Sequence, residues 1–258
     1  WDCGEFSSAA IWQQVPHPPG APLFLMIGKF FHVLIPFGDY GWRINLVAVF
    51  SSAVVVLLAY LITVMLIENF RGKPKNFSEA FAVSGASFVG AAALVFSDTF
   101  WYNAVESEVY ATSTLFVALI MYLIMKWNEQ ADEPGHERYL LVIMYLIGLS
   151  TGVHLLSILT IFSIYIIVYF RKYEFKWKSF LIMGVLAVIT FFIIYPFIVK
   201  YIPAFLSGHS AGRNAAREYN IEGSMLLTLL AIGTIIASAV GFWWARKNNK
   251  HVLALVCS

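Results

Sequence analysis

Long apolar segments recur along this chain and constrain its fold more than any other feature. A helix needs roughly 20 apolar residues to cross the hydrocarbon core of a bilayer. About seven segments reach or approach that length, and we expect crossings at residues 43–67, 80–101, 109–126, 139–153, 154–170, 179–199 and 223–244. Backbone groups in lipid must pair internally, and the sequence shows no dyad β pattern. The sequence therefore predicts an all-α, polytopic helical membrane protein.

Composition agrees with this fold class. The chain is 60% hydrophobic and 12% charged, whereas soluble domains have about 45–50% apolar and about 25% charged residues. The formal net charge of +2 gives no reason to expect a nucleic-acid partner. We interpret residues 1–258 as a single transmembrane domain, with an external segment at 1–42 and a transmembrane bundle at 43–244. Because the sequence opens on Trp1 without a signal peptide, we expect one more membrane helix before it.

The long apolar stretch 139–170 can be interpreted in two ways. It is long enough for one tilted helix, but Gly148, Gly152 and His154 lie in its middle and charged residues flank both ends. We favour two short helices with a tight turn near 152–154. A single span would place the downstream basic residues on the opposite side of the membrane from the upstream ones, which makes it the poorer interpretation.

The distribution of basic residues indicates the orientation of the chain. Twelve of the 17 lysines and arginines fall in four connecting segments: Arg71, Lys73 and Lys75; Lys126 and Arg138; Arg171, Lys172, Lys176 and Lys178; and Arg246, Lys247 and Lys250. The positive-inside rule assigns these segments to the cytoplasm. An odd number of crossings then leaves the N-terminal segment on the external face.

Ionisable residues gather in that first external segment. Asp2 and Glu5 are three residues apart and would be neighbours on one face of a helix. His17 opens HPPGAP, which is a rigid stretch because proline restricts φ. Simple solvation, or the preference of acids for a helix N-terminus, would also explain the two acids. His17 could equally belong to a turn that leads into the amphipathic stretch 23–34.

Two later external segments carry further candidates. The spacing of Asn103 and Glu106 is typical of a capping pair that opens the next helix, so a structural role for Glu106 is as well supported as a catalytic one. Glu108 would then lie one turn into a membrane helix, where an acid is costly and tends to be functional. His154 at its turn could belong to a site or could bond a free backbone carbonyl.

The last external segment contains Arg213 and Arg217, which are four residues apart. They could be ordinary solvated charges, but paired arginines suit phosphate recognition. The chain has no phosphate-binding glycine loop, zinc-spaced set of histidines and cysteines, or GxSxG element. Acids, histidines and arginines on the external face are therefore the groups available for chemistry.

Four motifs in order resemble one known family. WDCGEF is followed by HPPGAPLF, ESEVYATS and GLSTGVHLL, all within about residues 1–170. This combination resembles a bacterial, Bacteroidetes-type family of polytopic membrane proteins related to an animal transmembrane protein O-mannosyltransferase. The resemblance implies a class C glycosyltransferase-like core in a bacterial inner membrane, with its active face towards the periplasm. It also implies a polyprenyl-phosphate-linked sugar as donor and no certain cofactor.

The resemblance suggests a role for each candidate. Asp2, with Glu5 beside it, matches the acidic position of the first external segment and would act as general base on an acceptor hydroxyl. Glu5 and Glu108 would hold sugar hydroxyls or orient the base. The departing phosphate would be stabilised by an arginine, with help from His17 or His154. The acceptor would be a protein or a glycan, and a divalent metal between carboxylates and phosphate is compatible with this set.

Two other classes of protein compete with this hypothesis. A transporter could use the same acids and histidines along a substrate path, but its charges should lie near the bilayer midplane inside broken helices. Here the charges fall at the ends of the predicted spans and in connecting segments. A structural membrane protein would need no site at all, and would have no obvious use for HPPG beside paired acids.

Overall fold

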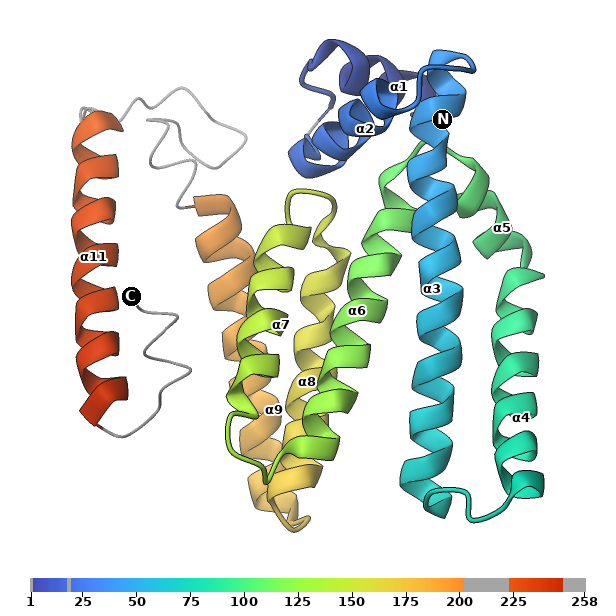
Figure 1. The fold of residues 1–258 in the computed structure, drawn as a ribbon. Coiled ribbons are helices and arrows are strands. Elements are labelled where there is room, and N and C mark those ends of the chain that lie inside the picture. The colour runs from blue at the N-terminus through green and yellow to red at the C-terminus, as the bar shows by residue number, and fades with distance from the viewer. Residues whose placement is uncertain (1, 18–19, 202–222, 248–258) are drawn as a thin grey trace. The chain divides into compact units, whose positions relative to one another are not determined.

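The computed structural model describes residues 2–17, 20–201 and 223–247, and all the regular secondary structure in these ranges is helical (Figure 1). The helices run in the order α1 (Cys3–Trp12), α2 (Pro22–Leu34), α3 (Tyr40–Arg71), α4 (Phe77–Val95), α5 (Asp98–Val105), α6 (Val109–Gln130), α7 (Glu137–Ser150), the 3-10 turn η1 (Leu155–Leu159), α8 (Thr160–Lys172), α9 (Trp177–Phe192), the π-helical η2 (Ile193–Tyr201) and α11 (Gly223–Lys247). The predicted external segment 1–42 is thus built largely from the two helices α1 and α2.

Five helical segments within the described residues are long and apolar enough to cross a membrane: Tyr40–Arg71, Phe77–Val95, Val109–Gln130, Leu155–Lys172 and Trp177–Pro196. The predicted fold class is confirmed, and the chain is a polytopic helical membrane protein. The two remaining predicted crossings correspond to α7, which has 14 residues, and to α11, whose apolar described part is Ile235–Trp244.

The structure confirms one predicted boundary and corrects two others. The stretch 139–170 is divided as expected, because α7 ends at Ser150 and η1 begins at Leu155. The predicted crossing 80–101 is wrong at its end, since α4 stops at Val95 and Ser97 precedes the separate helix α5. The predicted capping pair is also wrong. Asn103 lies inside α5, where its side-chain amide donates to the Thr99 carbonyl oxygen at 2.9 Å.

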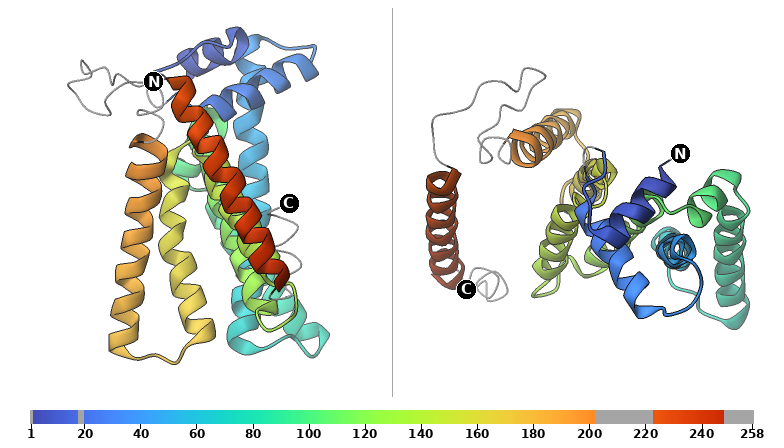
Figure 2. Two further views of the ribbon diagram at one scale, coloured as in Figure 1. Left: turned by 90° about the vertical axis from the view of Figure 1, so that its left-hand side faces the viewer. Right: turned by 90° about the horizontal axis from the view of Figure 1, so that it is seen from above.

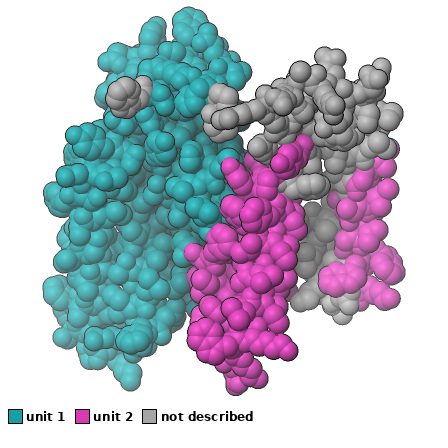
Figure 3. All heavy atoms as spheres, turned by 180° about the vertical axis from the view of Figure 1, so that it is seen from behind, with its two compact units in different colours: residues 1–129, 142–160 teal, residues 130–141, 161–258 magenta. Residues whose placement is uncertain are grey.

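The helices form two compact units, coloured separately in Figure 3. Unit 1 contains residues 1–129 and 142–160, and unit 2 contains residues 130–141 and 161–258. All the candidate site residues that the structure describes belong to unit 1. In unit 2, α8 and α9 are joined by hydroxyl pairs, Tyr165 with Thr190 at 2.8 Å and Tyr169 with Ser179 at 2.7 Å.

In unit 1, α1 and α2 lie across one end of α3 (Figures 1 and 2). The connection between α3 and α4 lies at the opposite end of α3 (Figure 1). Burial of apolar side chains holds the two short helices in place. The buried cluster combines residues of α1, α2, α3 and α6 with the N-cap of α2 and one residue from the turn after α7: Phe6, Ala9, Ala10, Ala21, Phe24, Leu25, Ile44, Val47, Val109, Phe116 and Val153. Each fully buried large side chain contributes roughly 1.5–3 kcal/mol relative to exposure.

Two glycines allow the close approaches that this packing needs. A Cβ on Gly28 of α2 would come within 3.0 Å of the Ala10 Cβ in α1. A Cβ on Gly152, in the turn after α7, would lie 3.0 Å from the Leu23 Cβ. There the Leu23 backbone N–H also donates to the Gly152 carbonyl oxygen at 2.7 Å. The start of α2 is therefore fixed to the turn between α7 and η1, and two of the four motifs meet.

Candidate functional site

The first residues of α1 bring acidic groups to the end of unit 1 where α1 and α2 lie. Asp2 is the N-cap residue of α1, and Glu5 falls in its first turn. Negative side chains are favoured there because the helix dipole leaves partial positive charge at the N-terminus. The same helix buries Phe6, Ala9 and Ala10 on its other side. Burial of that face leaves the acids on the outer side of α1, with side chains of Asp2 and Glu5 that are 49% and 41% exposed.

His17 lies in the segment after α1, which folds back so that His17 contacts both acids. Its backbone N–H donates to Glu5 Oε1 at 2.6 Å, and its ring Nδ1 lies 2.9 Å from Glu5 Oε2. The other ring nitrogen, Nε2, is 4.0 Å from Asp2 Oδ2. The hydrogen bond with Glu5 raises the pKa of His17, and the same bond lowers the pKa of Glu5. Glu5 therefore holds the imidazole so that its second nitrogen faces Asp2.

Glu108 lies behind this group and is bonded to the start of α1. It is buried, with 8% of its surface exposed. Its Oε1 accepts from the Asp2 backbone N–H at 3.3 Å and from the Cys3 thiol at 3.7 Å. Burial raises the pKa of the Cys3 thiol, and the negative charge of Glu108 raises it further. The predicted position of Glu108 one turn into a membrane helix is wrong, since α6 begins at Val109.

Glu106 joins the same group from the segment between α5 and α6. It is the C-cap residue of α5 and has an extended backbone. Between it and Glu108, the Ser107 hydroxyl donates to the Gly41 carbonyl oxygen at 3.5 Å, which ties this turn to the first residues of α3. Potential ligand atoms of Cys3, Glu106 and Glu108 lie within 4.8 Å of one another, and so do those of Asp2, Glu5 and His17.

The remaining predicted site residues do not join this cluster in the described part of the chain. His154 is the N-cap residue of η1, and its Nδ1 accepts from the Leu156 backbone N–H at 3.2 Å. Its ring lies 5.4 Å from that of Tyr110, which is two residues after Glu108. Burial lowers the pKa of His154. Arg213 and Arg217 lie outside the described residues.

Cys3 is the member of the cluster that the sequence analysis missed. It is a free thiol placed between the two predicted acids, and it faces Glu108. Its position next to Asp2 was the available signal, but a single cysteine gives no direction for its side chain. Only the packing of α1 shows that Cys3 turns towards Glu108, immediately before α6.

Comparison with known proteins identifies the family. Residues 2–177 match the family model described as "Protein O-mannosyl-transferase TMEM260 N-terminal domain", and this match covers more than half of the chain. The chain belongs to this TMEM260 N-terminal domain family. The matched region begins at Asp2 and includes every described residue of the cluster, whereas Arg213 and Arg217 lie beyond it.

Two relatives carry the same name. The chain is 28% identical over 149 residues to the mouse protein O-mannosyl-transferase TMEM260, an alignment that covers 58% of the chain and 19% of the mouse protein. It is 26% identical over 140 residues to the protein O-mannosyl-transferase tmem260 of Dictyostelium discoideum, covering 54% of the chain and 15% of that protein. The alignments thus span less than a fifth of each relative. No solved structure matches the chain at a significant level.

Proposed function

We propose that this protein is a membrane glycosyltransferase of class C type, which moves a sugar from a polyprenyl-phosphate donor to a protein serine or threonine hydroxyl. The observation that carries the proposal is the convergence of Asp2, Glu5 and His17 in front of the buried Glu108. These residues lie within the region that matches the TMEM260 N-terminal domain family. The names of the mouse and Dictyostelium relatives support mannose as the sugar and protein as the acceptor.

In the proposed reaction, Asp2 is the general base. Its carboxylate takes the proton of the acceptor hydroxyl as that oxygen forms a bond to the anomeric carbon of the sugar. The bond between the anomeric carbon and the donor phosphate breaks, and the polyprenyl phosphate leaves with the electron pair. The half-exposed side chain of Asp2 leaves room for an acceptor to approach. A positioned base typically contributes about 10²–10⁴-fold to the rate.

Neighbouring residues position Asp2 and stabilise the phosphate of the donor. Glu108 holds the Asp2 backbone from the buried side through its 3.3 Å bond. Glu5 fixes His17, whose Nε2 faces Asp2 and can donate to the carboxylate or to a phosphate oxygen of the donor. We assign further charge stabilisation on the phosphate to Arg213 or Arg217, which lie outside the described residues, and to His154. Donors aimed at developing negative charge stabilise the transition state.

The cluster also has the donor set for a divalent cation. Two carboxylates and one imidazole, from Asp2, Glu5 and His17, offer ligand atoms within 4.8 Å of one another. Oxygen and imidazole ligands of this kind suit Mg²⁺, Mn²⁺ or Zn²⁺. A cation bound there would supply charge neutralisation for the donor phosphate. Glu5 would then be shared between the cation and His17.

The external face is the side we propose for this reaction. Helix α3 begins at Tyr40, on the side of the cluster, and ends at Arg71, beside Lys73 and Lys75. Its 32 residues correspond to about 48 Å, enough to separate the two ends by a full bilayer. If the basic end is cytoplasmic, the cluster faces the periplasm of a bacterial inner membrane.

Transfer of labelled sugar tests the proposal. Membranes containing this protein are incubated with radiolabelled polyprenyl-phosphate mannose and an acceptor protein, and label in the acceptor is measured. We expect Asp2→Asn to lower transfer at least about 100-fold while the protein stays folded and inserted. Asp98→Asn is the matched control, because Asp98 is an exposed acid in the first turn of α5. Equal transfer by the Asp2→Asn protein would overturn the assignment of the base, and no transfer by the wild type would overturn the proposed activity.

A further inference from the structure

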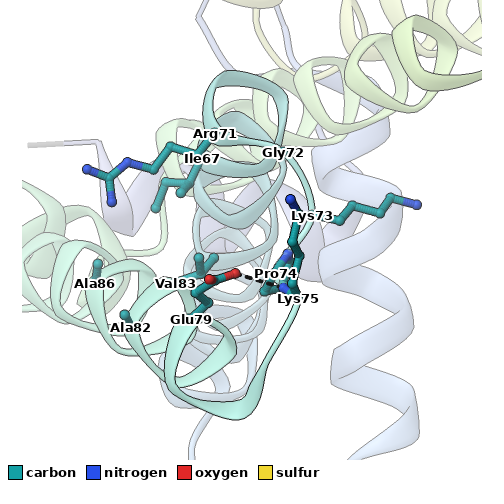
Figure 4. Close-up of a pocket in the computed structure, with 10 residues that line it drawn as sticks. All are labelled: Ile67, Arg71, Gly72, Lys73, Pro74, Lys75, Glu79, Ala82, Val83 and Ala86. Atoms are coloured by element: carbon teal, nitrogen blue, oxygen red, sulfur yellow. Dashed lines mark hydrogen bonds between the residues drawn. The ribbon is translucent and has the colours of Figure 1, made fainter.

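The connection between α3 and α4 forms a cavity at the opposite end of unit 1 from the acidic cluster. Its volume is about 600 Å³, and it lies between the last turn of α3 and the first turns of α4 (Figure 4). The chain turns at Gly72, whose φ of 85° is favourable for glycine alone. The Gly72 backbone N–H donates to the Glu68 carbonyl oxygen at 2.8 Å and so closes α3. The cavity is therefore a consequence of how the two membrane helices are joined.

Three basic side chains line this cavity. Arg71, Lys73 and Lys75 are exposed, and no ion pair joins any of them to an acid within the described ranges. Figure 4 shows Arg71 and Lys73 extending to opposite sides of the connection, with Pro74 and Lys75 between them. Their charged heads stay at the water-facing end of long flexible stems, so this end of the two helices carries concentrated positive charge.

The acid in the cavity is already engaged by the helix cap. Glu79 Oε2 accepts from the Lys75 backbone N–H at 2.8 Å, and Oε1 accepts from the Asn76 side-chain amide at 3.0 Å. The Glu79 backbone N–H in turn donates to Asn76 Oδ1 at 2.9 Å. This reciprocal arrangement satisfies the N-terminus of α4. The charged ends of Arg71, Lys73 and Lys75 are thus left to bind a ligand.

The rest of the cavity wall is apolar and continues into the membrane-spanning surface. Ile67 lies one turn before Arg71 in α3, Ala82 and Val83 lie near the start of α4, and all three line the cavity. Phe70, Phe77 and Phe81 flank the connection and are 90%, 85% and 71% exposed. Aromatic rings together with basic residues at the ends of apolar helices are typical of the interface between lipid and water. A ligand here would meet positive charge at one end and hydrocarbon at the other.

We propose that this cavity binds the headgroup of an anionic phospholipid. The phosphate would lie among Arg71, Lys73 and Lys75, and the acyl chains would follow the apolar wall formed by Ile67, Ala82 and Val83. Basic pockets between transmembrane helices are suited to such headgroups. A free phosphate would be attracted by the basic side chains but would leave the apolar wall of the cavity exposed. The site is separate from the acidic cluster and does not depend on the proposed transfer reaction.

Lipid binding to the purified full chain tests the proposal. Native mass spectrometry in detergent would measure apparent affinity for phosphatidylglycerol and for phosphatidylethanolamine, with inorganic phosphate as competitor. We expect a clear preference for phosphatidylglycerol and a loss of roughly 10- to 30-fold in Lys73→Gln/Lys75→Gln, since a lysine near anionic lipid contributes about a factor of five. Lys176→Gln/Lys178→Gln is the matched control, because these two lysines are also exposed and two residues apart, at the N-cap and in the first turn of the membrane-spanning helix α9.

A second variant separates the cavity from its charge. Ala82→Trp keeps every basic residue but fills part of the apolar wall, and we expect it to weaken phosphatidylglycerol binding several-fold. Equal losses in the two double lysine variants, or no preference over phosphatidylethanolamine, would overturn the proposal. Displacement by inorganic phosphate would identify a site for free anions instead. An unaffected Ala82→Trp protein would show that surface charge alone attracts the lipid, and would also overturn it.

Discussion

His17 is bonded to Glu5 twice, through its backbone N–H to Oε1 at 2.6 Å and through its ring Nδ1 to Oε2 at 2.9 Å. The pair closes the segment between α1 and α2 back onto the first turn of α1. It also orients Nε2 towards Asp2. The position of the imidazole in the candidate site thus depends on the ionisation of two exposed groups.

The first prediction concerns the pH range in which this pair holds. The pKa of His17 is raised and that of Glu5 is lowered by their hydrogen bond. The stabilisation that this hydrogen bond gives to the segment between α1 and α2 is fully present between about pH 4.3 and pH 6.5, the ordinary pKa values of the two side chains. It is lost as the pH falls through the lowered pKa of Glu5, and as the pH rises through the raised pKa of His17. An NMR titration should give a pKa for His17 above the ordinary value. Glu5→Gln should return it towards that value, and an unchanged pKa in this variant would contradict the assignment.

The second prediction concerns Glu108 as the buried support of Asp2. Glu108→Ala removes the acceptor for the Asp2 backbone N–H and the Cys3 thiol, and should destabilise the start of α1 by about 1–3 kcal/mol. Because burial and the charge of Glu108 raise the pKa of Cys3, the thiol should also react faster with maleimide, measured in a Cys257→Ser background. Glu108→Gln keeps an acceptor oxygen and should therefore destabilise the start of α1 less than Glu108→Ala does. An unchanged labelling rate in Glu108→Ala would show that Glu108 does not raise the pKa of the Cys3 thiol.

The third prediction concerns Gly152, where the turn after α7 meets α2. In Gly152→Ala the new Cβ would lie 3.0 Å from the Leu23 Cβ, while the backbone bond between these residues limits any retreat. We expect a loss of about 1–3 kcal/mol in unfolding free energy, measured by denaturation in detergent. Gly148→Ala is the control, since a Cβ there meets nothing within 4 Å. Equal stability of the two variants would show that position 152 and Leu23 have room for the added Cβ.

The fourth prediction concerns a buried polar contact between α3 and α6. The Ser51 and Thr112 hydroxyls lie 3.2 Å apart, and both residues are buried. Such bonds between membrane helices contribute about 0.6 kcal/mol on average, with a maximum of about 1.7. A double-mutant cycle with Ser51→Ala and Thr112→Val in detergent should give a coupling energy of that size. Additive effects of the two substitutions would show that the hydroxyls do not act as a pair.

Several local features of the fold could be predicted from the sequence. Apolar length defines the membrane helices, because each must satisfy its own backbone within lipid. The break near Gly152 and His154 was also predictable from small and polar residues inside an apolar run. The capping pair at Asn103 was predicted wrongly, although its spacing fits a helix start. There the break at 96–97 starts α5 earlier, so that Asn103 is already helical.

The sequence alone determined that this protein is built from membrane helices, because hydropathy acts locally along the chain. It also placed the candidate acids Asp2, Glu5, Glu106 and Glu108 outside or at the ends of the apolar segments. Tertiary structure decided which of those acids meet. Asp2 and Glu108 are bonded although 106 positions separate them, and no periodicity links residues at that distance. They meet because α1 buries Phe6 in the same core as Val109 at the start of α6. Packing of apolar surfaces, which has no direction of its own, thus placed the polar groups of the candidate site together.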